Sequence, residues 1–161
     1  MAVAEDLPNR RIRDWFIGTR QDMGIDVVIG GGPDTTKRLI RHLKQAGVVA
    51  LVSDRDLTGR GVEVEFFGER TTMPGGPAAL ADRTGAAIFP VAPRFRDGAG
   101  YHMVIEPELP LPQAESRAER IRLGTQAFAA RLEEIIREDP EQWHVIQPNW
   151  PSDRVWQETR S

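Results

Sequence analysis

The sequence predicts a single α/β domain in which helices flank a layered sheet. Three observations support this fold class. Short β-rich runs alternate with helical segments, the Pro and Gly residues fall between these segments, and 161 residues suffice for one hydrophobic core. Hydrophobic residues make up 40% and charged residues 28%, as in an ordinary globular protein. Residues 1–161 are therefore treated as one domain, with a poorly ordered tail at about 151–161.

The first third of the chain is expected to contain two helices and two strands. Apolar residues at helical spacing predict a helix over 8–23, which Gly24 ends. A β-rich run follows at 25–29, and capping residues predict a second helix over 34–46. The continuous apolar run at 48–52 predicts a strand that is buried on both faces.

The rest of the chain is expected to alternate strands and helices in the same way. In order, it should contain a polar loop at 53–61, a strand at 62–66, a looser turn around Glu69 and Arg70, a short helix at 77–83, paired strands at 86–95 and 101–105, and a long helix at 117–138. A short turn that includes Trp143 should follow.

Composition excludes several kinds of chemistry. The chain has no Cys, so disulfides, a thiolate nucleophile and cysteine-ligated zinc or iron–sulfur sites are absent. A net charge of -3 argues against a nucleic-acid partner. No apolar run approaches the ~18 residues of a membrane span, and the N-terminus lacks a signal-peptide pattern. The spacing of the three His residues suits no metal site, so neither a metal nor a cofactor is expected.

The charged loop at 53–61 is the most informative segment. It places Asp54, Arg55, Asp56 and Arg60 directly after the apolar run, where α/β folds bind their ligands. One interpretation is a solvated loop with Asp–Arg pairs. The other is a binding loop in which the two Arg hold phosphate and the two Asp position them. Composition alone leaves both interpretations open.

An ordered series of motifs gives this loop a context. The series comprises TRQDMG at 19–24, DRDLT at 54–58, GVEVEFFGE at 61–69, MPGGPAALA at 73–81, RTGAAIFPVAP at 83–93 and PEQWH at 140–144. It resembles the bacterial lysophospholipid acyltransferase-like superfamily, which includes the late lipid A acyltransferases. The resemblance is closest to the phosphatidylinositol mannoside acyltransferases of actinobacteria, and it extends from about residue 3 to about residue 153.

The resemblance implies the C-terminal half of a glycerolipid-acyltransferase-type domain, which would transfer a fatty acyl group from acyl-CoA to a sugar hydroxyl of a phosphatidylinositol mannoside. A lipid A-type acceptor is the alternative. The implied catalytic residues are Asp54 and Arg20, and the implied acyl-CoA contacts are Arg55, Asp56, Arg60 and Arg83. Acyl-CoA would be a co-substrate, with no further cofactor. The implied location is peripheral, on the cytoplasmic face of the cell membrane.

One part of the resemblance is missing. Enzymes of this superfamily use a His-x-x-x-x-Asp motif, in which the carboxylate orients the His that deprotonates the acceptor hydroxyl. The residues five positions after His42, His102 and His144 are Gly47, Pro107 and Asn149. The sequence is therefore expected to be a fragment of a larger enzyme or the product of a truncated gene.

A non-enzymatic interpretation also stays open. An inactive α/β remnant would bind lipid or CoA, or would associate with a partner, without turnover. Aromatic residues suited to membrane or partner contact as well as to a core are Trp15, Phe16, Trp143, Trp150 and Trp156.

Overall fold

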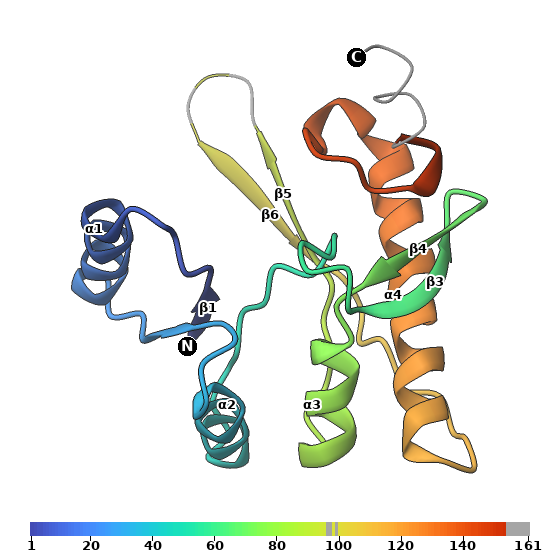
Figure 1. The fold of residues 1–161 in the computed structure, drawn as a ribbon, viewed down its shortest axis with the longest axis horizontal. Coiled ribbons are helices and arrows are strands. Elements are labelled where there is room, and N and C mark those ends of the chain that lie inside the picture. The colour runs from blue at the N-terminus through green and yellow to red at the C-terminus, as the bar shows by residue number, and fades with distance from the viewer. Residues whose placement is uncertain (96–97, 99, 154–161) are drawn as a thin grey trace. The chain divides into compact units, whose positions relative to one another are not determined.

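The computed structural model describes residues 1–95, 98 and 100–153 (Figure 1). Two compact units divide the chain, Met1–Val52 and Ser53–Ser161. Trp156 and most of the expected tail lie outside the described residues. The mixed α/β composition agrees with the predicted class. Among the described residues, the strands of the first unit form one two-stranded sheet, and those of the second unit form two two-stranded sheets.

The first unit contains one parallel strand pair and two helices. Its elements are β1 (Ala2–Ala4), α1 (Arg10–Asp22), β2 (Val27–Ile29) and α2 (Thr35–Lys44). Helix α1 begins at Arg10 because the Asn9 side chain accepts hydrogen bonds from the backbone N–H groups of the first turn. Both helices lie close to the predicted positions, with each end shifted by one or two residues.

The prediction of a buried strand at 48–52 is wrong. Only Ala50 pairs, through a single parallel bridge to Ala2, and Val48 and Val52 are 78% and 84% exposed. Burial on both faces requires helices above and below a sheet of several strands. The pair β1–β2 is three residues long, so it offers this run too short an edge to form a ladder.

Helix α1 does not dock its apolar face on a core. Trp15 is 65% exposed, Ile12 and Phe16 are also exposed, and none of the α1 residues is buried. The apolar spacing that predicted the helix is correct, but the face it marks is open. No helix in the described residues combines the length and apolar character that a membrane crossing requires.

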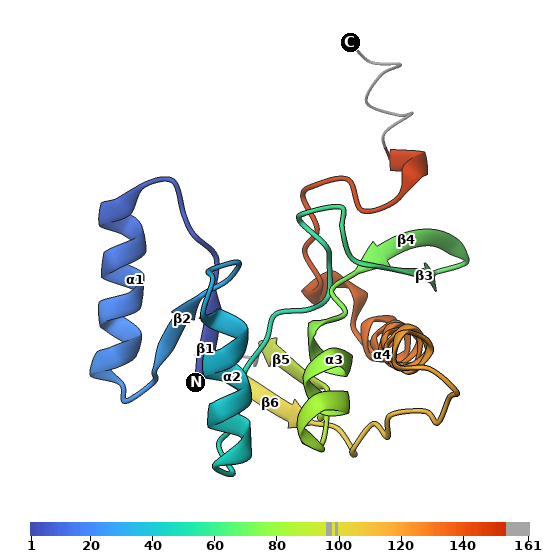
Figure 2. The ribbon, with the colours of Figure 1, turned by 60° about the horizontal axis from the view of Figure 1, so that its bottom comes forward.

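The second unit is built on a hairpin and a long helix. Strands β3 (Val62–Phe66) and β4 (Glu69–Met73) pair in antiparallel fashion, and α4 (Arg117–Glu138) packs against β3 (Figure 2). Phe67 and Gly68 at the turn both have positive φ, as a type I′ hairpin turn requires. The alternation predicted for β3 is confirmed, with Val64 and Phe66 buried and the two Glu residues between and before them exposed.

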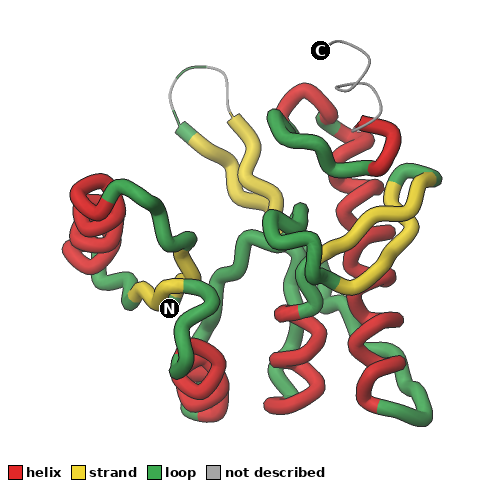
Figure 3. Tube along the Cα trace, in the orientation of Figure 1, coloured by secondary structure: helices red, strands yellow, loops and turns green. Residues whose placement is uncertain are grey.

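The remaining elements extend this unit. Helix α3 (Gly76–Thr84) packs on α4, strands β5 (Val91–Phe95) and β6 (Tyr101–Ile105) form a second hairpin, and the 3-10 helix η1 (Pro140–Gln142) follows α4. The predicted pairing of β5 with β6 is confirmed. The prediction of a strand over 86–90 is wrong (Figure 3). Pro90 lacks a backbone N–H, so only the carbonyls of Ile88 and Pro90 form bonds to residues 106–109.

The second unit has one hydrophobic cluster, between the β3–β4 hairpin and α4. Its buried members are Val64, Phe66, Met73, Ala92, Ala129, Leu132, Ile135 and Ile136. Phe66 and Met73 are among the largest fully buried side chains. Complete burial of a Phe side chain stabilises the folded chain by several kcal/mol, so this cluster is the main source of stability in the unit.

We therefore expect Phe66→Ala to lower the free energy of unfolding by about 3 to 5 kcal/mol, because it leaves a cavity in the cluster. Phe89→Ala is the matched control, since Phe89 is half exposed in the same unit, and it should cost about 1 kcal/mol or less. Urea denaturation followed by circular dichroism measures both. Equal losses in the two variants would contradict the assignment of the core.

Candidate functional site

Asp56 organises the charged loop at 53–61. Its Oδ1 accepts hydrogen bonds from Thr58 N (2.9 Å) and Thr58 Oγ1 (2.7 Å). Its Oδ2 accepts from Gly61 N and from Thr72 Oγ1 on β4. Burial raises the pKa of Asp56, but these hydrogen bonds outweigh burial and hold the pKa below its usual value. The carboxylate therefore ties the loop to the hairpin in its charged form.

The loop closes through a position that only glycine fits. A Cβ at Gly61 would lie 2.4 Å from the carbonyl oxygen of Met73 and 2.7 Å from Oδ2 of Asp56. The absence of a side chain lets the loop approach β4 closely enough for the Gly61 N–H to reach the carboxylate. Loop and hairpin thus form one rigid piece.

Asp54 is held by a residue from the C-terminal part of the unit. Its Oδ2 accepts a hydrogen bond from the indole Nε1 of Trp143 at 3.0 Å, although 89 positions separate the two residues. Its Oδ1 is buried and has no hydrogen-bond partner among the described residues. A buried carboxylate oxygen without a donor is rare in folded proteins and marks a candidate functional group.

Trp143 belongs to an aromatic cluster that fixes its orientation. It meets Phe66 edge-on, with ring centroids 5.8 Å apart, and it stacks on Phe67 at 6.2 Å. Trp150 completes the cluster by stacking on Phe66, and its indole N–H donates to the carbonyl of Phe66 at 2.9 Å. Trp143 and Trp150 therefore pack inside this unit and are partly buried, whereas the sequence left open a role in surface contact.

The segment that follows Trp143 is fastened to the β3–β4 hairpin. Ser152 donates from its backbone N (2.9 Å) and its Oγ (2.6 Å) to the Glu69 carboxylate. Asp153 accepts from the backbone N–H groups of Asn149 and Trp150, which caps the turn. The prediction that Glu69 and Arg70 lie in a looser turn is wrong, because both lie in β4 and pair with β3.

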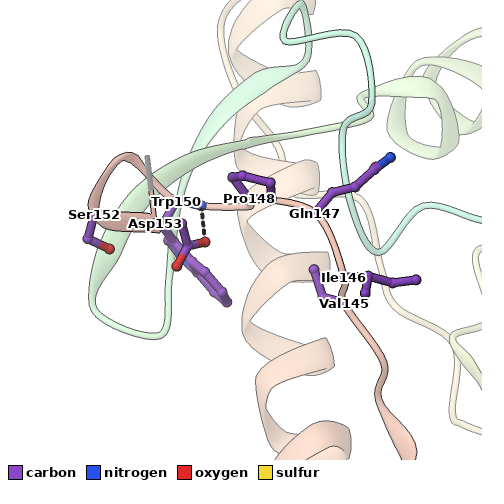
Figure 4. Close-up of a pocket in the computed structure, with 7 residues that line it drawn as sticks. All are labelled: Val145, Ile146, Gln147, Pro148, Trp150, Ser152 and Asp153. Atoms are coloured by element: carbon purple, nitrogen blue, oxygen red, sulfur yellow. Dashed lines mark hydrogen bonds between the residues drawn. The ribbon is translucent and has the colours of Figure 1, made fainter. Parts of the chain in front are cut away.

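An open recess of about 490 Å³ lies beside this segment. Its lining, shown in Figure 4, comprises Val145, Ile146, Gln147, Pro148, Trp150, Ser152 and Asp153. Two of its polar lining residues, Ser152 and Asp153, are already engaged by Glu69 and by the backbone. We do not assign it a catalytic role.

The basic residues of the loop are not paired with its carboxylates in the described residues. In the part of the chain that the structure describes, both Asp side chains accept from neutral donors, and neither contacts Arg55 or Arg60. Arg55 is partly exposed and Arg60 is exposed. Arg83 lies near the end of α3 and is also exposed. The structure thus gathers Asp54, Arg55, Asp56 and Arg60 on one loop and places Arg83 on a separate element.

Arg20 lies in the first unit, in the last turn of α1. Its guanidinium Cζ is 5.2 Å from the centroid of the Phe16 ring, and Nη1 donates to the carbonyl of Phe16 at 3.2 Å. This local contact holds the side chain against its own helix. Docking of the apolar face of α1 on a core does not hold Arg20 in place, because that face is exposed.

Comparison with known proteins identifies the family. The sequence model of the bacterial lipid A biosynthesis acyltransferase family matches residues 1–152. The chain belongs to this family. It is 39% identical to the phosphatidylinositol mannoside acyltransferases of Mycolicibacterium smegmatis and of two strains of Mycobacterium tuberculosis, over 153 residues or 94% of the chain. The aligned region is 48% of the first relative and 46% of the others, so the chain spans about half the length of the curated relatives it matches.

One charged group in this family member was not singled out from its sequence. Asp82 on α3 is 8% exposed at its side chain and pairs with Arg117 at 2.9 Å and Arg120 at 2.7 Å, both on α4. The hydrogen bond from Arg120, aided by Arg117, lowers the pKa of Asp82. This group joins two helices of the acyltransferase-family chain. No local sequence pattern predicts these ion pairs, because Arg117 and Arg120 lie 35 and 38 positions after Asp82.

The Asp56 network predicts an acid-sensitive loop. A carboxylate whose folded pKa is depressed contributes stability above its unfolded pKa, near ~3.9, and that stability is lost as the pH falls through the folded pKa. Asp56→Asn should therefore lower the free energy of unfolding by about 1 to 2 kcal/mol at pH 6, and the deficit should shrink toward zero as the pH falls through the lowered pKa of the folded-state carboxyl. Urea denaturation at a series of pH values measures the difference.

Glu63→Gln is the control for this measurement. Glu63 is an exposed residue of the same hairpin, and its ion pair in the described residues is with exposed Arg70. It should change the free energy of unfolding by about 0.5 kcal/mol or less at every pH. A deficit of Asp56→Asn that is the same at pH 6 and at acid pH would refute the role of the charged carboxylate.

Proposed function

We propose that this chain acts in the transfer of a fatty acyl group from acyl-CoA to a sugar hydroxyl of a glycolipid, with a phosphatidylinositol mannoside as the acceptor. Membership in the acyltransferase family and the names of three relatives support this function. The observation that carries it is the carboxylate of Asp54, which the partly buried indole of Trp143 holds by one oxygen, within a loop that resembles a motif of the acyltransferase superfamily. A lipid A-type acceptor is the second candidate and rests on the name of the family alone.

The proposed roles follow from the chemistry of thioester transfer. Such a reaction needs a base for the acceptor hydroxyl, charge stabilisation for the oxyanion, and contacts to the CoA phosphates. Asp54 is proposed to take part in the reaction by accepting a hydrogen bond, and Arg20 by binding substrate oxygen. Exposed Arg60 and Arg83, together with Arg55, are proposed to contact the phosphates, while Asp56 shapes the loop that carries two of them.

The three His residues of this chain bear on whether it catalyses acyl transfer by itself. None of His42, His102 and His144 has Asp five positions later, so none forms the His-x-x-x-x-Asp motif. Without a positioned base the rate of transfer falls by about 100- to 10,000-fold. We therefore propose that the 161-residue chain by itself gives no measurable turnover. A chain that binds acyl-CoA or lipid without catalysis is the non-enzymatic alternative.

We also propose that the protein contacts the cytoplasmic face of the cell membrane peripherally, through α1. The exposed face of this helix carries Ile12, Trp15 and Phe16, and exposed Arg10 and Arg11 lie in its first turn. Aromatic and aliphatic side chains flanked by Arg are typical of helices that lie in the interface of an anionic membrane. Such a location would bring the chain to a lipid-anchored acceptor.

A transfer assay tests the reaction. We expect a chimaera that carries residues 3–153 of this chain in place of the matched half of the Mycolicibacterium smegmatis relative to transfer acyl groups from acyl-CoA to phosphatidylinositol mannoside. Asp54→Asn and Arg20→Ala should lower kcat/KM by about 30- to 1,000-fold, because each removes a charge-assisted contact. The isolated chain should show no turnover in the same assay.

Arg70→Gln is the matched control for these variants. Arg70 is 81% exposed at its side chain and pairs only with exposed Glu63, so kcat/KM should stay within about threefold. Circular dichroism checks that each variant folds. If Arg70→Gln falls as far as Asp54→Asn, the assignment of the site is wrong. Turnover by the isolated chain at the rate of the chimaera would instead make one of its own His residues the base.

Vesicle sedimentation tests the proposed membrane contact. Trp15→Ser and Phe16→Ser should each weaken binding of the chain to anionic phosphatidylglycerol vesicles by about tenfold, because burial of one aromatic ring in the interface contributes on the order of 1.4 kcal/mol. Phe89→Ser, which alters an exposed Phe in the second unit, should leave binding unchanged. Equal binding by all three variants would exclude α1 as the contact.

A further inference from the structure

We propose that Trp143 is a positioning residue for Asp54, and that the PEQWH motif at 140–144 serves to deliver its indole N–H to that carboxylate. This inference rests on the proposed function, because it deepens the role given there to Asp54. The juxtaposition that carries it is a core indole N–H 3.0 Å from Oδ2 of Asp54, with Oδ1 buried and without a donor among the described residues.

The direction of the indole N–H is set by packing and not by the loop. Phe66, Phe67 and Trp150 surround the ring of Trp143, with ring centroids 5.8 to 6.2 Å from that of Trp143. Phe66 is itself fully buried between the hairpin and α4. The packed aromatic cluster therefore fixes the position of Oδ2 of Asp54 relative to the hydrophobic core of the unit.

Fixing one oxygen determines where the other lies. A carboxylate is planar, so the bond from Trp143 to Oδ2 leaves Oδ1 as the acceptor with unused capacity. An oxygen that is shielded from water and has no donor loses its hydrogen bonds to water, and no hydrogen bond within the protein replaces them. A hydroxyl or N–H group that reached Oδ1 during the reaction would supply the missing hydrogen bond to an acceptor whose other oxygen Trp143 already holds.

The cluster supplies its own comparison for this role. Trp150 is a second partly buried indole that packs on Phe66, but its N–H donates to the carbonyl of Phe66 and not to a carboxylate. Replacing either Trp by Phe keeps an aromatic ring and removes one N–H. A difference between the two variants therefore reports what the N–H of Trp143 does for Asp54, separately from its contribution to packing.

A double-mutant cycle in the acyltransferase chimaera tests the proposal. We expect Trp143→Phe to lower kcat by about 10- to 100-fold with KM within about threefold, because a reacting group displaced by an ångström loses rate before it loses binding. In the Asp54→Asn background, Trp143→Phe should lower kcat by less than about threefold further, since the group it positions is already gone. Trp150→Phe should lower kcat by the same small factor in both backgrounds.

A spectroscopic measurement on the 161-residue chain checks the contact without activity. The indole N–H resonances, assigned from the Trp→Phe variants, should show that Asp54→Asn moves the signal of Trp143 and leaves that of Trp150 in place. The proposal is overturned if the Trp143 signal does not move, if Trp143→Phe keeps full kcat, or if its effect is the same with and without Asp54. A wild-type chimaera without transfer would overturn the proposed function, and the positioning role with it.

Discussion

The packing of the β3–β4 hairpin on α4 is the interaction on which the rest of the second unit depends. It buries Phe66 and Met73 and brings Ala129 of α4 into the same cluster, where its small side chain allows the helix to approach β3 closely. Polar side chains of α4 complete the contact. Gln126 donates to and accepts from the backbone of Glu65, and Glu133 accepts from the N–H of Phe67. The backbone N–H and C=O groups of Glu65 are thereby satisfied without a further strand.

The two aspartates of the loop serve different purposes because their surroundings differ. Asp56 accepts four hydrogen bonds and has no capacity left for a ligand beyond those contacts. It maintains the loop. Asp54 accepts one hydrogen bond and keeps one oxygen unused. Because acceptors that are already saturated cannot bind substrate strongly, the unsaturated carboxylate is the better candidate for chemistry, although both residues have the same side chain.

The sequence predicted local features of the fold more reliably than pairings. Helix α4 was predicted with its observed bounds, because its apolar spacing is regular and Ser116 and Asp139 flank it. The run at 48–52 was mistaken for a buried strand, because hydrophobicity indicates only that a segment favours burial and not that a partner is present to bury it. The strand at 69–73 was missed, since Glu69, Arg70 and two Thr form no apolar alternation and pairing with β3 determines its conformation.

The residues of the candidate site also fall into two groups, those that local sequence patterns indicate and those that only the fold brings together. Motif resemblance found Asp54, and the local spacing of Asp56 and Thr58 is a recognisable side-chain-capped turn. From the sequence, Trp143 was only an aromatic residue that would suit a core or a surface. The carboxylate that it binds, Asp54, is distant in the sequence, so no local pattern links the two residues. Contacts across 89 positions are made by the fold, which here is the hairpin–helix packing that orients the indole. Trp143 therefore links the hydrophobic core to Asp54, a carboxylate with one buried oxygen that has no hydrogen-bond partner among the described residues.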